Sequence, residues 1–421
     1  MTAGETGNIH PLRLPRDVWI LATVGFLIAI GFGVMSPILP IYARTFGVSS
    51  FLIGLVVSSL SILRLTTMPV SSWLLRFIGP REVAIAGCAL IGFTTFMIGV
   101  SDSYWGIVVW RGLSGFGSAL YGVSAMALLF AAAPPEVRGR SNAIYGGGFV
   151  LGGMAGPALG GLIVGVSIHA PFFFYAVTLV LAAVVMAVLL PRTPVGRRQQ
   201  MRDATIGLVD LVKDRRFRAA IVVNFGNGWQ SNGVRAMLVP LFITGALHMP
   251  TLWAGIAFTI AAVVQACCLP LTGWGTDRLG RRFMLLTGGC ATAAISIGFS
   301  LAQSYLVLVI LMCLYAAGAS ASSSSAQAML ADTVPVTASS GLAAYQMAGD
   351  IGQILGPLVA GATMDIVSIR WAWVFGAAII LVGVGLSSLT AKTIQPPVGS
   401  SGSTGDPHGG PQGAGQPVRE D

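Results

Sequence analysis

One carboxylate, Asp350, stands in the middle of a long apolar segment, where a charged group needs a chemical reason. It follows Gly341 by nine residues, so in a helix it would lie about 13 Å from the end of that segment. A charge at such a depth in a membrane is costly, and residues of this kind are generally paired, protonated or turned to water. The other acidic residues fall in expected loops, tails or segment ends. Asp350 is therefore the carboxylate best placed to bind and release a proton.

Three arginines, Arg64, Arg111 and Arg235, also lie within apolar segments. Arg64 precedes Arg76 by twelve residues, which places it about 18 Å from the end of its own segment. Arg64 is therefore a candidate partner for Asp350. On the segment of Asp350, polar side chains recur at helical spacing and form a stripe on one face; they are Gln346, Asp350 and Gln353.

The stretch NFGNGWQSNGVR at 224–235 combines three glycines with the amides Asn227, Gln230 and Asn232, and it ends on Arg235. Irregular, polar backbone persists at membrane depth only where it is buried in protein or lines a cavity. The composition therefore predicts an irregular helix that forms part of a substrate cavity. Other side chains assigned to this cavity, on weaker grounds, are Gln265, Tyr121, Tyr145, Tyr345 and Gln346.

The surrounding chain is too apolar to fold in water. Of its 421 residues, 54% are hydrophobic and 9% are charged, whereas soluble domains carry about 25% charged residues. Twelve segments approach the length of about 20 residues that spans a bilayer as a helix. They lie at roughly 17–43, 51–76, 82–101, 104–132, 142–166, 170–190, 219–244, 251–275, 283–302, 305–330, 341–365 and 371–391. The sequence therefore predicts an all-α membrane protein with twelve transmembrane helices in a lipid bilayer.

The basic residues predict which side of the membrane each loop occupies. An even number of spans puts both termini on one side, and of the 24 Lys and Arg residues only Arg44 and Arg370 fall in loops of the other side. Because basic loops accumulate in the cytoplasm, both termini are expected there. The net charge of +9 is then a topology signal, and nucleic acid is not an expected partner. The arginine-rich, lysine-poor composition suggests a bacterial gene, so we expect the bacterial inner (plasma) membrane.

Offsets of 200 and 201 residues bring the two halves of the chain into register, which indicates an internal repeat. GPALGG at 156–161 matches GPLVAG at 356–361, Gly33 matches Gly233, and Arg64 matches Gln265. We expect six-helix bundles at 17–191 and 219–392, joined by a cytoplasmic linker at 192–218 with a short helix near IGLVDLVK. The remaining segments are cytoplasmic tails at 1–16 and 393–421, and the Gly/Ser/Pro-rich composition of the second predicts disorder.

Three patterns in the chain carry a family resemblance. The loop pattern GWGTDRLGRR follows the eighth segment, and its characteristic residues are Gly273, Asp277, Arg278, Gly280, Arg281 and Arg282. RxxxGxG begins at Arg111, and GxxxGPxxGG supplies Gly152, Gly156, Pro157, Gly160 and Gly161. In these patterns the chain resembles the major facilitator superfamily. The last pattern resembles the signature of its drug/proton antiporters, in this case of the twelve-span type.

The resemblance implies the major facilitator fold, in which two pseudo-symmetric six-helix bundles hold a substrate site between them. It also implies that the second and eleventh spans run side by side. We therefore expect Arg64 and Asp350 to pair across that boundary in one transport state. The pair is either a permanent salt bridge or a coupling device that protonation of Asp350 breaks.

The resemblance further implies roles for the other motifs. Arg111 would take part in proton transfer, with a structural hydrogen bond to nearby backbone as the alternative. The loop pattern around Asp277 would form a cytoplasmic gate. In the first half Arg76 stands where the family has an aspartate, which puts the matching gate of that half in doubt.

Two stripes of small residues line the fifth and eleventh spans. Gly148, Gly152, Gly156 and Gly160 repeat every four residues and share one helix face, and the second stripe follows the same spacing with Ala348, Gly352, Gly356 and Ala360. Small faces let helix backbones approach closely in lipid. The stripes serve either helix packing alone or surfaces on which the two halves rock, with Pro157 and Pro357 bending the helices.

The predicted function is a proton-coupled secondary active transporter that exports small amphipathic molecules, as multidrug efflux antiporters do. The chain has no GxxxxGK[ST] phosphate loop and no catalytic constellation, so neither an ATP-driven pump nor an enzyme is expected. No cofactor is implied, and the four histidines lack the neighbours of a metal site. The alternatives are a proton symporter for uptake of a sugar or organic anion, and a non-transporting membrane signalling protein. The expected partners are a small-molecule substrate and protons, and the chain is expected to be a monomer.

Overall fold

The computed structural model describes residues 14–75, 77–133, 137–191, 208–333 and 339–390, and within these ranges the chain is helical, without a strand. Within the described ranges, ten helical spans are long and apolar enough to cross a membrane. Two further predicted spans bring the set to twelve. One is the series α9 (Arg215–Asn227), η3 (Gly228–Val234) and α10 (Arg235–Gly245), and the other is α14 (Ser339–Ile366).

The first six spans are made by seven helices. These are α1 (Arg16–Met35) with the short α2 (Leu39–Arg44), α3 (Ser50–Leu74), α4 (Pro80–Gly99), α5 (Tyr104–Ala132), α6 (Arg138–Ile163) and α7 (Ala170–Leu189). Each lies within a few residues of a predicted span. The segment predicted at 17–43 differs in one respect, because turns at 36–38 separate α1 from α2.

The second half begins with the six-residue helix α8 (Leu208–Lys213), which falls in the expected IGLVDLVK stretch. The rest of the predicted linker and both predicted tails lie outside the described residues, apart from a few flanking positions. After α9, η3 and α10 come α11 (Leu252–Arg278), α12 (Arg281–Phe299), α13 (Tyr305–Thr333), α14 and α15 (Ile369–Thr390).

Local sequence explains where several helices begin. Ser49 and Ser103 accept hydrogen bonds from the backbone amides of Leu52 and Gly106 at the starts of α3 and α5, and Asp214 caps α9 in the same way through Arg216. Such caps satisfy amides that lack a partner in the first turn. The turn between α11 and α12 requires Gly280, whose φ of 92° lies in a region that other residues rarely adopt.

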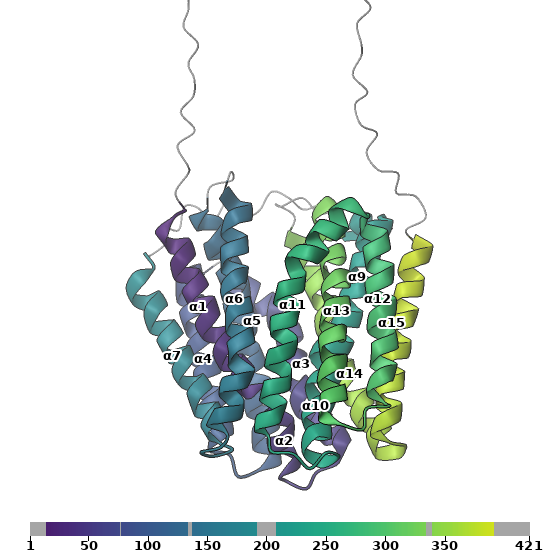
Figure 1. Cartoon of the computed structure of the whole chain (residues 1–421). Helices are drawn as coiled ribbons and strands as arrows, with labels where there is room; N and C mark the ends of the chain where they lie inside the picture. The colour runs from purple at the N-terminus through teal and green to yellow at the C-terminus, as the bar shows by residue number, and fades with distance from the viewer. Residues whose placement is uncertain (1–13, 76, 134–136, 192–207, 334–338, 391–421) are drawn as a thin grey trace, which may run out of the picture.

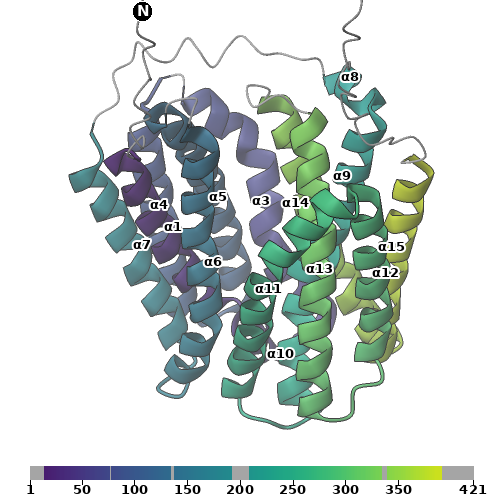
Figure 2. The ribbon, with the colours of Figure 1, turned by 45° about the horizontal axis from the view of Figure 1, so that its top comes forward.

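Two large hydrophobic cores hold the helices together, and two smaller clusters add to the packing of the second half. The larger is built on α1 to α7 around Leu21, Met35 and Phe172, and the other on η3 to α15 around Leu238, Tyr315 and Trp373. We call these the first bundle (α1–α7) and the second bundle (α9–α15). Figure 1 shows them as two groups of upright helices, and in Figure 2 α3 and α14 stand side by side between them.

We name the two ends of the molecule after the helix ends that lie there. The terminal end is the one where α1 begins at Arg16 and α15 ends at Thr390, and the opposite end is the one where α3 begins and α14 ends (Figure 1). The second bundle reaches across at the opposite end, because Met237 and Leu241 of α10 belong to the core of the first bundle.

Candidate functional site

The bundles meet through two matching helix pairs, α3 with α14 and α6 with α11. A Cβ on Gly54 of α3 would overlap the carbonyl oxygen of Pro357 on α14, and a Cβ on Gly255 of α11 would overlap that of Pro157 on α6. Glycine is therefore required at both positions for the backbones to touch. Gly54 and Gly255 were not singled out from the sequence, although they are separated by the repeat offset of 201 residues.

The α3–α14 contact begins at the opposite end with a carboxylate. Asp365, in the last turn of α14, accepts hydrogen bonds from the backbone amides of Ser50 and Phe51, each at 2.8 Å. These amides open α3, so a residue of the second bundle caps a helix of the first. One turn earlier on α14, a side chain at Gly361 would overlap the carbonyl of Ser50, which keeps the two helix ends in direct contact.

Further along the same helix pair, polar contacts continue toward the terminal end. The hydroxyl of Ser58 donates to the carbonyl of Ile354 at 2.7 Å. Arg64 then donates from Nε to Oδ2 of Asp350 at 3.1 Å, and its second nitrogen forms an ion pair with the other carboxylate oxygen. The expected pairing of Arg64 with Asp350 across the boundary is confirmed as a contact.

The two partners of this ion pair differ in their access to water. The Asp350 side chain is 3% exposed, whereas that of Arg64 is 30% exposed. A buried carboxylate without its cation would be strongly unfavourable, so Asp350 depends on Arg64 more than Arg64 depends on Asp350. Past Arg64, on the last turns of α3, Val70 and Trp73 are 46% and 55% exposed.

The small-residue stripes pack inside the bundles and not between them, so their interpretation as rocking surfaces is wrong. Along α6, side chains at Gly148, Gly152, Gly156 and Gly160 would overlap backbone carbonyls of α1. Along α14, side chains at Gly352 and Gly356 would overlap backbone atoms of Phe225 and Trp229 in α9 and η3. Within the antiporter-like pattern, Pro157 lies against Gly255 and Gly161 against Leu252, both of α11 in the second bundle.

The polar stretch 224–235 is irregular, as expected, and takes the form of the π-helical segment η3. Its amides point in different directions. Asn232 is exposed, and Asn227 donates to the Ser323 hydroxyl at 3.0 Å. Gln230 is fully buried inside the second bundle, where its Nε2 donates to the Ser296 hydroxyl of α12 at 3.1 Å. The predicted cavity position is therefore wrong for Gln230, whose amide instead forms a hydrogen bond between two helices of the second bundle.

The two remaining intramembrane arginines, Arg111 and Arg235, form no ion pair with a described residue. Arg111 is 5% exposed; its guanidinium lies 5.8 Å from the ring centre of Phe32, and one of its nitrogens lies 3.8 Å from the sulfur of Met35. The Nε atoms of both arginines are buried without a hydrogen-bond partner in the described part of the chain. The alternative of a backbone hydrogen bond from Arg111 has no counterpart among the described contacts.

The weaker cavity candidates are spread over both bundles. The hydroxyls of Tyr121 and Tyr145 lie 3.2 Å apart in the first bundle, and the carbonyl of Tyr345 in the second accepts a hydrogen bond from Asn224 at 2.6 Å. Gln265 is half-buried and Gln346 is exposed. Their assignment to a substrate cavity stays a prediction.

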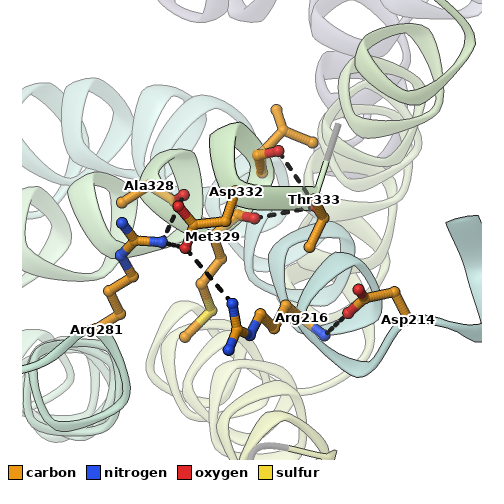
Figure 3. A network of polar contacts seen from close by, with 8 residues as sticks. Asp214, Arg216, Arg281, Ala328, Met329, Asp332 and Thr333 are labelled. Carbon is orange, nitrogen blue, oxygen red and sulfur yellow. Dashed lines mark hydrogen bonds and ion pairs between the residues drawn. The ribbon is translucent and has the colours of Figure 1, made fainter. Parts of the chain in front are cut away.

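The loop pattern 273–282 lies at the terminal end and engages the second bundle. Arg281 of α12 forms an ion pair with Asp332 of α13 and donates to the carbonyl of Ala328 at 3.2 Å, and Arg216 of α9 lies 3.9 Å from the same carboxylate. Figure 3 shows this network, in which Asp332 faces both arginines.

The other residues of that pattern have different surroundings. Asp277 is exposed, Arg282 is half-buried, and Arg278 stacks on Trp274 at 4.7 Å. A side chain at Gly273 would meet open space, so close packing does not require a glycine at this position. Among the described contacts none joins the pattern to the first bundle, and its role as a gate stays a prediction. Arg76 lies outside the described residues.

Comparison with known proteins places this architecture in a family. The sequence model of the Major Facilitator Superfamily matches residues 21–229 and 220–417. An uncharacterized MFS-type transporter of Methanocaldococcus jannaschii, MJ1560, is 24% identical over 382 residues, which are 88% of this chain and 97% of that protein. The multidrug efflux protein YfmO of Bacillus subtilis is 24% identical over 379 residues, covering 89% and 92% of the two chains.

The fold is also shared with solved structures. A bacterial homologue of the human lysosomal transporter Spinster, in an inward-facing and unoccupied conformation, superposes with a TM-score of 0.74 at 15% identity, over 89% of this chain and 96% of that one. The family consists of transporters and not of enzymes, and its members cross the membrane many times. The chain therefore belongs to the Major Facilitator Superfamily.

Proposed function

We propose that the protein is a proton-coupled antiporter that exports small amphipathic compounds by alternating access. The observation that carries this proposal is the ion pair between Arg64 and Asp350, which joins the two bundles through the described carboxylate that lies deepest in a span. An ion gradient must drive a transporter that has no nucleotide-binding loop, and a buried carboxylate suits a proton. The multidrug efflux function of the relative YfmO supports export.

The contacts between the bundles support a state that is open toward the terminal end. The backbone contacts at Gly54, Gly255 and Gly361 all lie nearer the opposite end. On the terminal side of the Pro157 contact, Gly146 and Gly153 of α6 face open space. The basic loops favour a cytoplasmic position for the terminal end, so this arrangement corresponds to an inward-open transporter, as in the Spinster homologue of similar fold. We place the protein, as a monomer, in the bacterial inner membrane with both termini in the cytoplasm.

In this proposal the proton acts on the α3–α14 contact. When Asp350 is ionised, it binds Arg64 and holds the two helices together near the middle of the membrane. When Asp350 takes up a proton, it becomes neutral while Arg64 keeps its charge, and the ion pair is lost. The equilibrium between the two arrangements of the bundles then shifts by the free energy of that pair. Arg111 is proposed to assist proton transfer from the neighbouring span.

A second candidate function is uptake of an organic anion by proton symport. It is favoured by Arg111 and Arg235, which have no carboxylate partner among the described residues and could attract an anionic substrate. Both candidates use the same proton site, so they differ in the direction of transport and not in its chemistry.

The test is transport in inverted membrane vesicles with a panel of fluorescent cationic, neutral and anionic amphiphiles. Acidifying the vesicle lumen should drive exported compounds inward for the wild type. Asp350→Asn should abolish this gradient-driven accumulation, because an amide cannot carry the proton. The matched control is Asp102→Asn, since Asp102 is an exposed residue in a loop.

Two outcomes would contradict the proposal. Intact proton-driven accumulation in Asp350→Asn would exclude this carboxylate as the proton carrier. Accumulation of a substrate by right-side-out vesicles, with none in inverted vesicles, would favour the uptake symporter.

A further inference from the structure

Arg235 lies in an aromatic environment, and its positive charge has no carboxylate partner among the described residues. It is the first residue of α10, directly after the π-helical segment η3. Its guanidinium carbon lies 5.1 Å from the ring centre of Tyr315 on α13 and 5.5 Å from that of Phe258 on α11. The hydroxyl of Tyr315 lies 2.8 Å from that of Ser231 in η3, which fixes the orientation of this ring. Three helices therefore hold the guanidinium in one place.

Cation–π contacts with two rings compensate part of the cost of burying this charge, but they supply no acceptor for its N–H groups. The Nε atom of Arg235 is buried and has no hydrogen-bond partner in the described part of the chain. The described ion pairs engage other arginines, namely Arg64, Arg81, Arg216 and Arg281. Arginine cannot lose its proton in a protein. The positive charge of Arg235 therefore remains available to a ligand.

The internal repeat indicates that this charge is not needed for packing. At the repeat offset of 200 residues, Arg235 corresponds to Met35 in the first bundle. Met35 is fully buried in the core of that bundle, so an uncharged side chain of similar length fills the equivalent position. The fold therefore does not require a charged residue at the position of Arg235, although in the first bundle the guanidinium of Arg111 lies 3.8 Å from the Met35 sulfur.

We propose that Arg235, Phe258 and Tyr315 form a subsite for the carboxylate of an aromatic or otherwise planar amphiphile. The N–H groups of the guanidinium would donate to the carboxylate, and the two rings would contact the adjacent apolar part of the ligand. Arg235 is half-buried, so part of its side chain is accessible. This inference rests on the proposed transport function and narrows its substrates to amphiphiles that carry a carboxylate.

The experiment measures binding and not transport, so that it can fail separately from the proposed proton coupling. The full chain in lipid nanodiscs is titrated with 2-naphthoate and with its neutral amide, 2-naphthamide, by equilibrium dialysis. The wild type should bind the carboxylate more tightly. Arg235→Gln should weaken naphthoate binding by about tenfold or more, the factor expected from loss of a charge-assisted hydrogen bond, and leave naphthamide binding unchanged.

Two further variants separate charge from structure. Arg235→Lys should retain part of the preference for naphthoate, because it keeps the charge but loses the planar group that stacks on the rings. Arg370→Gln removes an exposed arginine from the opposite end and should leave the binding of both probes unchanged. Arg235→Met, which copies the residue of the first bundle, replaces Arg235→Gln if that variant is not monodisperse.

Three results would overturn the subsite. The first is a wild type that binds naphthoate no more tightly than naphthamide, or that binds neither probe. The second is an Arg235→Gln variant with wild-type affinity for naphthoate, and the third is an Arg235→Gln variant that loses affinity for both probes equally. The last would assign Arg235 to structure alone. Loss of proton-driven transport in Asp350→Asn has no bearing on any of them, because no gradient is applied.

Discussion

The two helix pairs that join the bundles are alike in backbone and different in charge. Gly54 against Pro357 and Gly255 against Pro157 are the same contact repeated by the internal symmetry. On the α3–α14 pair this contact is flanked by the Arg64–Asp350 ion pair and by the Asp365 cap. On the α6–α11 pair the corresponding positions, at offsets of 201 and 200, hold the uncharged residues Gln265, Val150 and Gly165.

This difference assigns backbone packing to both helix pairs and charge to one of them. Close backbone packing is found at both pairs and can guide the bundles as they move. Among the described contacts the ion pair is found at one of the two helix pairs. In the proposed mechanism, protonation of Asp350 would therefore weaken α3–α14 without a matching change at α6–α11. The network at the terminal end is also one-sided. The partner of Arg281 is Asp332, whereas at the offset of 200 the first bundle has Arg81 and Ala132, and Arg81 bonds instead to Glu82 and the Ala187 carbonyl.

The largest expected effect comes from removing the cation of the charged pair. Arg64→Ala leaves Asp350 buried without a partner and should lower stability by about 3–5 kcal/mol, measured by thermal unfolding in detergent. Asp350→Asn should lower stability by less, because the part-exposed Arg64 can turn toward water. Gln265→Ala, at the matching site of the uncharged pair, should stay within about 1 kcal/mol of the wild type. Equal losses for Arg64→Ala and Gln265→Ala would remove the distinction between the pairs.

The next effect tests the symmetry of the backbone contacts. Gly54→Ala and Gly255→Ala each place a methyl group against a proline carbonyl, so each should weaken the closed contact by a similar amount, about 1–3 kcal/mol. Labelling of cysteines introduced at the opposite end should become faster in both variants. Gly153→Ala, in open space on α6, is the matched control and should leave labelling unchanged. A strong effect at one glycine and none at the other would show that only one pair carries the closure.

A smaller effect is expected from the cap at the opposite end. Asp365→Ala removes two hydrogen bonds to the first turn of α3 and should weaken that end of the α3–α14 contact by about 0.5–2 kcal/mol. The same cysteine labelling would report it as faster modification near Ser50. Gly165→Ala, at the matching position of the other pair, should have no such effect. No change in Asp365→Ala would assign closure at this end to the backbone contacts alone.

The smallest effect is expected at the terminal end. Asp332→Asn breaks the ion pair with Arg281 at a partly exposed site, where such pairs contribute about 0.2–1 kcal/mol. Ala132→Asp offers Arg81 the partner that the repeat lacks and should raise stability by no more than that amount. Thermal unfolding at low and high salt measures both changes, since screening should reduce them. A loss of several kcal/mol of stability in Asp332→Asn would contradict this expectation and show that the network contributes more than an exposed ion pair does.

Hydropathy and charge in the sequence predicted much of this arrangement. Long apolar segments located the spans. Arg64 and Asp350 were rare charges at a similar depth, and their pairing was predicted because the family resemblance implies that their two spans are neighbours. The sequence did not predict as well which neighbouring helix each face would contact. The spacing of Gly152 and Gly156 predicted close approach of another helix, but a small stripe does not encode which helix fills it, and the neighbour is α1 of the same bundle.

Other misses have different physical causes. The repeat offset could have identified Gly54 and Gly255, yet a single glycine in a helix forms no local pattern. Gln230 was assigned to a cavity because it is polar in an apolar stretch, whereas a hydroxyl of a neighbouring helix, that of Ser296, satisfies it inside the bundle. That neighbour is more than sixty residues away in the chain, so only the tertiary structure brings the two together.

The closure at the opposite end is built largely on main-chain atoms, which has a consequence for how the protein can vary. The acceptors facing Gly54 and Gly255 are proline carbonyls, and the donors to Asp365 are the amides of Ser50 and Phe51. Substitution of Phe51 by any residue except proline leaves its amide in place. One partner in each contact is thus insensitive to most mutations. In the proposed transporter, side chains that line a substrate path could therefore diversify toward new compounds while these contacts between the bundles are retained.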